Sequence, residues 1–208
     1  IEQVVLKQLK EDYQANLTQL EEKMNTRINI INSGLRILRI FDQPDTVVRD
    51  SLIKNIAVIT SDPTFDPIQN DLISSGNIRL IKDDKLKRLL SSWSSDVVAL
   101  KEIEDVWSEI ANHTMDLVLT NLGLSRDATN SFMNDINHTW ILDNKTKLQK
   151  IEIGPSKLSS PLHEIVTSKG LESMASSAVT FNNSANQQSA ALIKRINEII
   201  ELIDESIK

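Results

Sequence analysis

Three side chains that could ligate a metal ion share one face of a predicted helix. Glu109, His113 and Asp116 follow one another at intervals of four and three residues, which brings them to the same side of successive helical turns. A protein metal site usually draws ligands from more than one element and includes a second histidine, a requirement that a set on a single helix does not meet. We interpret the three residues as a solvated helix face on which Glu109 pairs with His113. We predict no metal site and no cofactor site.

Two groups of neighbouring carboxylates could in principle act as a general acid and a general base. Asp83 and Asp84 precede a helical pattern, where an Asp side chain caps the first turn and its charge favours the helix dipole. Glu102, Glu104 and Asp105 are spread around the predicted helix, so we expect them to be exposed to solvent. An acid/base pair would need burial in a cleft. We therefore assign both groups structural roles and predict no catalytic residue.

Nucleophilic and phosphate-binding motifs are also missing from the sequence. His138 and His163 could each join a serine in a nucleophilic site, but the chain has no Gly-x-Ser-x-Gly motif and no glycine-rich phosphate loop. The chain has no cysteine, which excludes disulfides, thiol catalysis and cysteine-ligated zinc.

Composition limits the fold that would position these residues. The 208 residues are 40% hydrophobic and 25% charged, with only 5 glycines and 5 prolines, which leaves few turns for an all-β fold. The net charge of −6 argues against a nucleic-acid partner, because such surfaces are basic. The sequence holds no apolar run of about 18 residues, the length that would span a bilayer.

Apolar residues recur at intervals of three and four over most of the chain, which predicts helices. We expect a long helix over residues 1–41, a break at Asp42–Asp45, a helix from Asp45 or Thr46 to Thr60, a helix from Asp84 to about Leu119, and a last helix from about Leu171 to Ile207. The first helix could be a coiled-coil arm or the spine of a bundle, and we favour the spine. Its stripe is predicted to comprise Leu6, Leu9, Tyr13, Leu17, Leu20, Met24, Ile28, Ile31, Leu35 and Leu38.

The densest cluster of turn residues lies between the second and third of these helices. Asp66 and Pro67 predict the start of a short helix that ends at Ser75–Gly76, with Gly76 in the left-handed conformation. We expect Phe65 to anchor this corner in the core, and 77–81 to be an extended link. Trp93 and Trp107, two heptads apart, are predicted to pack in the core.

Further along, residues 126–160 carry a weaker pattern. A short helix over 127–136, short strands or a loop at 140–142 and 147–153, and a helix that starts at Ser160–Pro161 are the interpretations we favour. Gly170 is predicted to separate that helix from the last one.

Three motifs between residues 63 and 88 resemble a bacterial family of unknown function. They are Pro63-Thr64-Phe65, then Leu72-Ile73-Ser74-Ser75-Gly76, then Leu80-Ile81-Lys82-Asp83-Asp84-Lys85-Leu86-Lys87-Arg88. Members of that family have a short cytoplasmic piece, one N-terminal transmembrane helix and a helical extracytoplasmic domain. The resemblance implies a location and a fold but no reaction. We expect Ile1, which lacks a preceding helix cap, to follow a removed membrane anchor.

Together these observations predict an all-α fold, an irregular bundle of two or three long helices with several short connecting helices. We expect a single domain over 1–208, with the long helix 1–41 leading from the missing anchor, a bundle formed by 42–124 and 160–208, and an irregular connection at 125–159.

The predicted function is a periplasmic interaction or sensing domain of a protein anchored in the bacterial inner membrane, with a protein partner or a small ligand. The alternatives are a soluble location, a hydrolase-like enzyme with a site near Phe65 and Trp93, and a structural domain that forms a homo-oligomer through residues 1–41.

Overall fold

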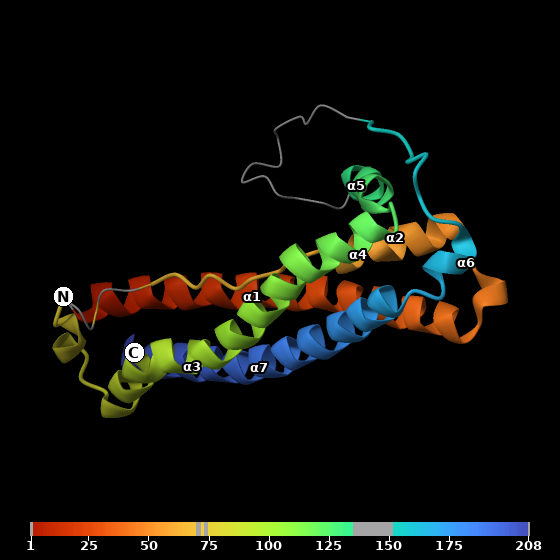
Figure 1. The fold of residues 1–208 in the computed structure, drawn as a ribbon. Helices are drawn as coiled ribbons and strands as arrows, with labels where there is room; N and C mark the ends of the chain where they lie inside the picture. Colours follow the sequence, from red (N-terminus) through yellow and green to blue (C-terminus); the bar gives the residue numbers. More distant parts are fainter. Residues whose placement is uncertain (1, 70–71, 73–74, 135–151, 208) are drawn as a thin grey trace. The chain divides into compact units, whose positions relative to one another are not determined.

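Most of the chain that the structure describes is helical. A computed structural model (Figure 1) describes residues 2–69, 72, 75–134 and 152–207, and none of them forms a β-strand. The all-α fold, an irregular bundle of long helices joined by short ones, is confirmed. The α-helices are α1 (Glu2–Asp42), α2 (Arg49–Ile59), α3 (Asp84–Glu109), α4 (Met115–Asn121), α5 (Ser125–Met133), α6 (Leu162–Ile165) and α7 (Lys169–Ile207).

The chain divides into two compact units, each with its own hydrophobic core. Unit 1 comprises Ile1–Arg27, Pro63–Asp105 and Asn183–Lys208, and unit 2 comprises Ile28–Asp62 and Val106–Asn182. The three long helices, α1, α3 and α7, contribute residues to both units. The prediction of a single domain stays a prediction.

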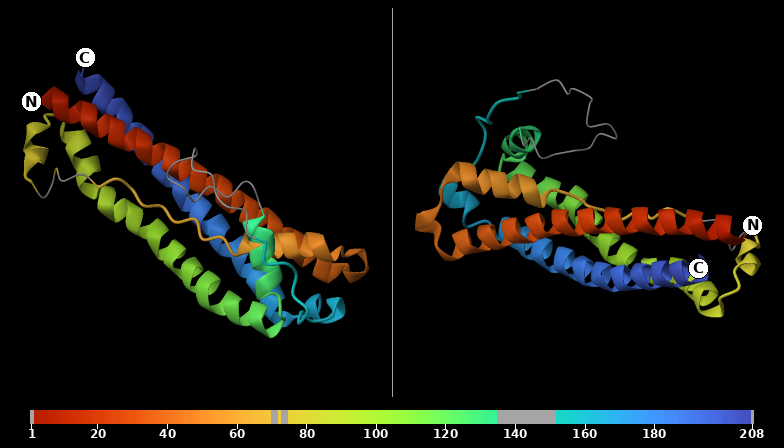
Figure 2. Two further views of the ribbon diagram at one scale, coloured as in Figure 1. Left: turned by 90° about the horizontal axis from the view of Figure 1, so that it is seen from above. Right: turned by 180° about the vertical axis from the view of Figure 1, so that it is seen from behind.

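In unit 1 the three long helices form a coiled-coil bundle. Glu2 at the start of α1 pairs with Lys82 just before α3, so α1 and α3 run in the same direction. Lys10 pairs with Asp204 near the end of α7, so α7 runs in the opposite direction. Figure 2 shows the three helices from two further sides.

Apart from Leu89 in α3, the buried positions of these three helices in unit 1 recur at steps of three and four with a seven-residue period, which is the pattern of knobs-into-holes packing. The buried residues include polar as well as apolar types. They are Leu6, Leu9, Tyr13, Asn16, Leu20 and Arg27 in α1, Leu86, Leu90, Trp93, Leu100 and Glu104 in α3, and Ala185, Ser189, Leu192, Ile196, Ile199 and Ile203 in α7.

The predicted stripe of α1 was wrong in its second half. Ile28 and Leu35 were assigned to the core, but they are 46% and 47% exposed, whereas Ile30 and Ile37 are buried. The prediction followed apolar residues only, so it left the seven-residue period where that period passes through polar residues such as Arg27.

Within unit 2, α1 and α7 approach each other closely at Gly34. A Cβ atom at this position would lie 2.8 Å from Val179 Cγ2 and 2.9 Å from the carbonyl oxygen of Ala175. The small side chains of Ala175 and Ala178, both buried, complete this contact. Glycine is therefore required by the space between the two helices.

The connection between α2 and α3 differs from the prediction. Pro67 was expected to start a short helix, but the described residues after α2, from 61 to 69, contain no helix. The residue before a proline avoids the helical region, and here side chains of α1 bind the backbone of Asp66 and Ile68 instead. The expected extended link at 77–81 was also wrong, because Asn77–Leu80 forms a 3₁₀ turn.

Other expectations for this connection are confirmed. Gly76 has a φ of 71°, in the left-handed region. Phe65 is buried in the core of unit 1. Asp83 caps α3, because its Oδ1 accepts a hydrogen bond of 2.6 Å from the backbone N–H of Leu86.

In unit 2 several helices begin or end a few residues away from the predicted boundaries. A 3₁₀ turn at Pro44–Thr46 precedes α2, which starts at Arg49 rather than at residue 45 or 46. α5 occupies the first part of the segment predicted as an irregular connection. Gly170 does not separate two helices, because α7 already begins at Lys169. The possible strands at 140–142 and at most of 147–153 lie outside the described residues.

A π-helical turn, Ile110–Thr114, joins α3 to α4. The buried positions on either side of it are Trp107 and Met115, eight residues apart, followed by Leu119. Two turns of an α-helix usually separate such positions by about seven residues. The π turn takes up the one extra residue, so the apolar face of α4 still points to the core of unit 2.

Candidate functional site

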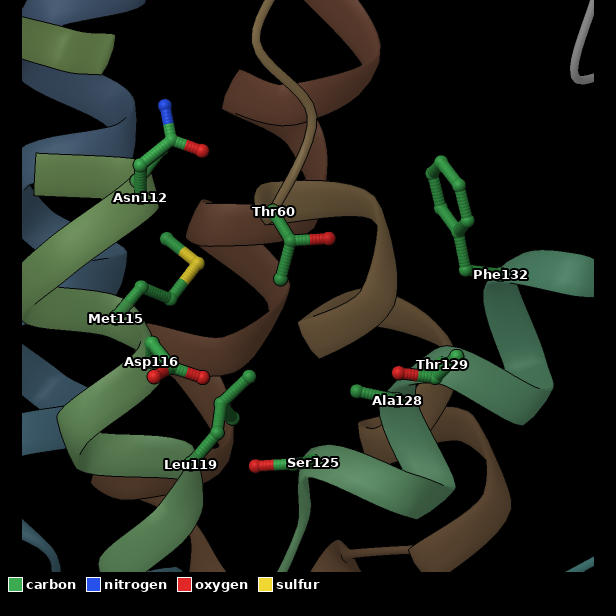
Figure 3. A pocket seen from close by; sticks show the side chains of 10 residues that line it. Thr60, Asn112, Met115, Asp116, Leu119, Ser125, Ala128, Thr129 and Phe132 are labelled. Atoms are coloured by element: carbon green, nitrogen blue, oxygen red, sulfur yellow. The ribbon is translucent and has the colours of Figure 1, made fainter. Parts of the chain in front are cut away.

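A pocket in unit 2 lies where α4, α5 and the end of α2 meet. Its volume is about 290 Å³. The wall is formed by residues from four elements (Figure 3): Thr60 after α2, Ala111 and Asn112 in the π turn, Met115, Asp116 and Leu119 in α4, and Ser125, Ala128, Thr129 and Phe132 in α5.

The pocket has an apolar floor and a polar rim. Met115, Leu119 and Ala128 are buried and belong to the core of unit 2. The carboxylate of Asp116 and the hydroxyl group of Thr129 point towards the space between α4 and α5 (Figure 3). Asp116 is the only charged residue of the described wall. Such a combination is typical of small-molecule sites, where apolar contact gives affinity and a few polar groups fix orientation.

Local structure explains how these side chains reach the pocket. The π turn brings Asn112 and Met115 to the same wall, whereas regular helical spacing would rotate Met115 by about 80° from the direction of Trp107. α5 is held against α2 by Asp127, a buried carboxylate that accepts hydrogen bonds from Arg49 Nη2 at 2.8 Å and from the backbone N–H of Ser156 at 2.7 Å.

The structure separates the three residues that were considered as a metal-like set. Glu109 and His113 form the predicted pair, with 3.4 Å between His113 Nδ1 and Glu109 Oε2 and both side chains more than 70% exposed. Asp116 lies in the pocket wall, which contains neither of them. Within the described ranges, no group of three His, Asp or Glu side chains could hold a metal ion. His163 lies in α6, and His138 lies outside the described residues.

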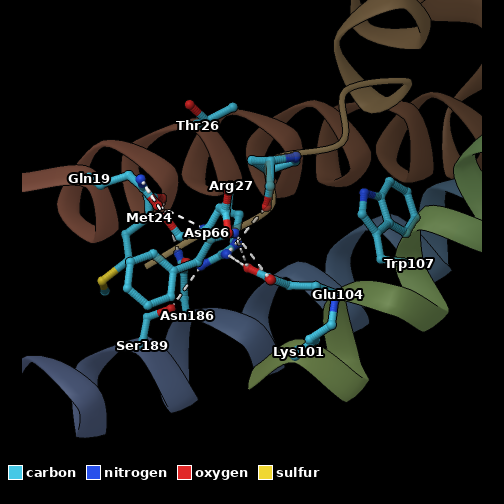
Figure 4. A network of polar contacts seen from close by, with 12 residues as sticks. Gln19, Met24, Thr26, Arg27, Asp66, Lys101, Glu104, Trp107, Asn186 and Ser189 are labelled. Carbon is cyan, nitrogen blue, oxygen red and sulfur yellow. Dashed lines mark hydrogen bonds and ion pairs between the residues drawn. The ribbon is translucent and has the colours of Figure 1, made fainter. Parts of the chain in front are cut away.

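A buried polar network in unit 1 was missed by the sequence analysis. Glu104 was expected to be exposed, but it is 4% exposed and forms an ion pair with Arg27, which is 1% exposed (Figure 4). The Arg27 guanidinium also donates to Ser189 Oγ of α7 at 2.8 Å and to the carbonyl oxygen of Pro63 at 3.3 Å.

This network is a polar layer across the bundle, with members from all three long helices. Burial lowers the pKa of the Arg27 guanidinium, and the Glu104 carboxylate opposes that effect. The seven-residue period of buried positions could have predicted that Arg27 and Glu104 are buried, because both residues fall on it. A charged residue at such a position is buried and requires a partner.

Phe65 and Trp93, which the enzyme alternative placed beside a site, are core residues. They are 6% and 3% exposed, and the Trp93 ring packs edge-on against Tyr13 with a centroid distance of 5.2 Å. Trp107 is also buried and donates a hydrogen bond of 3.0 Å to the carbonyl oxygen of Ser61. The predicted core role of both tryptophans is confirmed.

Comparisons with known proteins found no matching family model, no matching curated protein and no matching solved structure. In the part of the chain that the structure describes, no helix combines the length and the apolar character needed to cross a membrane.

Proposed function

We propose that this chain is an interaction or sensing domain of a membrane-anchored bacterial protein, located in the periplasm, and that the pocket of unit 2 is its ligand site. The observation that carries the sensing role is the pocket itself, in which one carboxylate stands above a buried apolar floor. The membrane anchor and the periplasmic location rest on the motifs at Pro63–Phe65, Leu72–Gly76 and Leu80–Arg88, which resemble a family with that organisation.

The chemistry of the wall selects a ligand class. A volume of about 290 Å³ is at the small end of ligand pockets and would hold on the order of ten non-hydrogen atoms. Within the described wall, Asp116 supplies negative charge and no basic residue balances it. The ligand is therefore a small primary amine with a short apolar body that contacts Met115 and Leu119 and an ammonium group that contacts Asp116.

Ligand binding is tested with a panel of small primary amines and alcohols of the same shape. We expect the amines to raise the thermal midpoint and to bind by calorimetry, and Asp116→Asn to weaken their binding at least tenfold. Glu109→Gln is the matched control, because Glu109 is exposed at the end of α3 and does not line the pocket. Equal binding of amines and alcohols, or unchanged binding by Asp116→Asn, would contradict the proposed site.

The location is tested with the full-length gene product in its own cells. We expect the protein in the inner-membrane fraction and this domain to be digested by protease only after the outer membrane has been permeabilised. Recovery of the full-length protein from the cytosolic fraction would refute the anchor and leave the pocket hypothesis open.

A further inference from the structure

The segment Pro63–Ile68 lies in unit 1 as an extended chain, and no strand among the described residues accompanies it. Its side chains alternate as in a β-strand, because the odd-numbered ones from Pro63 to Pro67 are buried and the even-numbered ones from Thr64 to Ile68 are exposed. Figure 2 shows the segment as a coil that follows α1. Three side chains of a short extended segment therefore enter the bundle, and three face solvent.

Two amide side chains of α1 bind the backbone of this segment in the manner of a neighbouring strand. Gln19 Nε2 donates to the carbonyl oxygen of Asp66 at 2.9 Å, and Gln19 Oε1 accepts from the N–H of Asp66 at 2.8 Å. Asn16 Oδ1 accepts from the N–H of Ile68 at 2.7 Å, and Asn16 Nδ2 lies 3.5 Å from the carbonyl oxygen of Ile68. Each amide thus contacts both polar groups of one residue, and the two residues are two apart, as strand pairing requires.

The buried polar layer binds the same backbone from the other side. The carboxylate of Glu104 accepts hydrogen bonds from the N–H of Phe65 at 3.1 and 3.2 Å, and Arg27 Nη2 donates to the carbonyl oxygen of Pro63 at 3.3 Å. Among the described residues, the backbone from 62 to 69 makes no hydrogen bond to other backbone groups. In the part of the chain that the structure describes, the backbone of the segment is therefore held by side chains of the bundle.

We propose that the surface of α1 and α3 that Pro63–Ile68 covers (the groove) is a binding site for an extended polypeptide, and that Pro63–Ile68 occupies it as a built-in ligand. The partner is a segment of another protein with proline, an aromatic residue and proline at alternate positions, which enters when the built-in segment leaves. Proteins that recognise extended peptides at a sheet edge use backbone hydrogen bonds for affinity and pockets for alternate side chains for specificity. Here the side-chain amides of Asn16 and Gln19 take the place of the sheet edge.

Prolines suit this role for two reasons. Pro63 and Pro67 have no N–H that the groove would have to satisfy. Their rings also keep the free peptide extended, which lowers the entropy lost on binding. The outward positions, Thr64, Asp66 and Ile68, are exposed and place no demand on the side chains of a partner.

The test uses a labelled synthetic peptide that spans residues 61–69 and measures its binding to the full chain by fluorescence anisotropy. The protein carries Phe65→Ala, which weakens the built-in segment without changing Asn16, Gln19 or Glu104. We expect the peptide to bind this variant at least tenfold more tightly than the wild-type protein. Phe65→Leu replaces Phe65→Ala if circular dichroism shows that the first variant has lost helix.

Backbone methylation separates groove binding from unspecific attachment. Peptides N-methylated at Asp66 and Ile68 lose the donors to Gln19 and Asn16, and we expect them to bind at least tenfold more weakly. A peptide N-methylated at Gln69, whose N–H has no partner among the described residues, is the matched control and should bind as the unmodified peptide does. Binding that ignores methylation at Asp66 and Ile68, or no binding to a folded variant, would overturn the proposal.

Discussion

The buried ion pair between Arg27 and Glu104 can be tested with a double-mutant cycle. Glu104→Leu leaves the guanidinium charge in a site where it is 1% exposed, and Arg27→Met leaves the carboxylate charge in the same surroundings. Loss of one partner of a buried pair costs about 3–5 kcal/mol. With a slope of about 2 kcal/mol per molar urea, each single variant should lower the unfolding midpoint by roughly 1.5–2.5 M.

The double variant distinguishes an ion pair from two independent residues. Arg27→Met with Glu104→Leu removes both charges, so its cost falls to that of the groups left without a partner, chiefly the N–H of Phe65 and the carbonyl oxygen of Pro63. One or two such groups cost about 1–3 kcal/mol each. With about 4 kcal/mol for each single variant and about 4 kcal/mol for the double variant, the coupling free energy between the two sites should be about 4 kcal/mol, above the usual range for contacting residues.

The assay is urea unfolding followed by fluorescence of Trp93 in a background without other tryptophans, since Trp93 belongs to the same core. Asp105→Asn is the matched control, because Asp105 is the next residue of α3, its side chain is 63% exposed, and only a small change is expected. If the free-energy changes of the two single variants add to that of the double variant within about 0.5 kcal/mol, the two residues do not act as a pair and the reasoning fails.

Two further predictions concern helix packing and surface charge. Gly34→Ala should lower the thermal midpoint, because the added Cβ meets the Ala175 carbonyl at 2.9 Å, and overpacking of about 1–3 kcal/mol exceeds the gain of about 1 kcal/mol in helix propensity. Asn32→Ala on the exposed face of α1 is the control and should not lower the midpoint. Equal midpoints for Gly34→Ala and the wild-type protein would contradict the close approach of α1 and α7. Glu198→Gln should destabilise at neutral pH, because the hydrogen bond from Lys85 holds the pKa of Glu198 below its ordinary value of 4.5. A carboxyl with a lowered folded pKa stabilises above its unfolded pKa and loses that effect as pH falls through the folded pKa. The difference in thermal midpoint between wild type and Glu198→Gln should therefore close below pH 4.5 and shrink with added salt. Glu201→Gln is the control and should not show this difference. A difference for Glu198→Gln that persists in acid would refute the role of the ion pair.

The helices of this protein follow from the sequence because their signal is long and repeated. The apolar rhythm of α1 and α7 extends over many turns, so it predicted both helices almost to their ends. Local chemistry also predicted the left-handed Gly76 and a cap of α3 by Asp83 or Asp84, of which the structure has Asp83, since each feature depends only on its own few residues.

The parts that the sequence did not predict depend on distant partners. Asp66 and Pro67 are as suitable for a helix start as for an extended segment, and Gln19 and Asn16, about 50 residues away, decide between the two. Glu104 looks like a surface residue until Arg27 is placed opposite it. The pocket needs α2, α4 and α5 together, and only Asp116 among its wall had been considered as a functional residue.

The π turn at Ile110–Thr114 makes the length of this stretch as important as its composition. Each residue of a helix turns the next by about 100°, so deletion of a single residue here would rotate α3 against α4 while every wall residue from Met115 onward kept its identity. Homologous chains that differ by one residue at this turn would then have pockets of a different shape, even where all the lining side chains are the same.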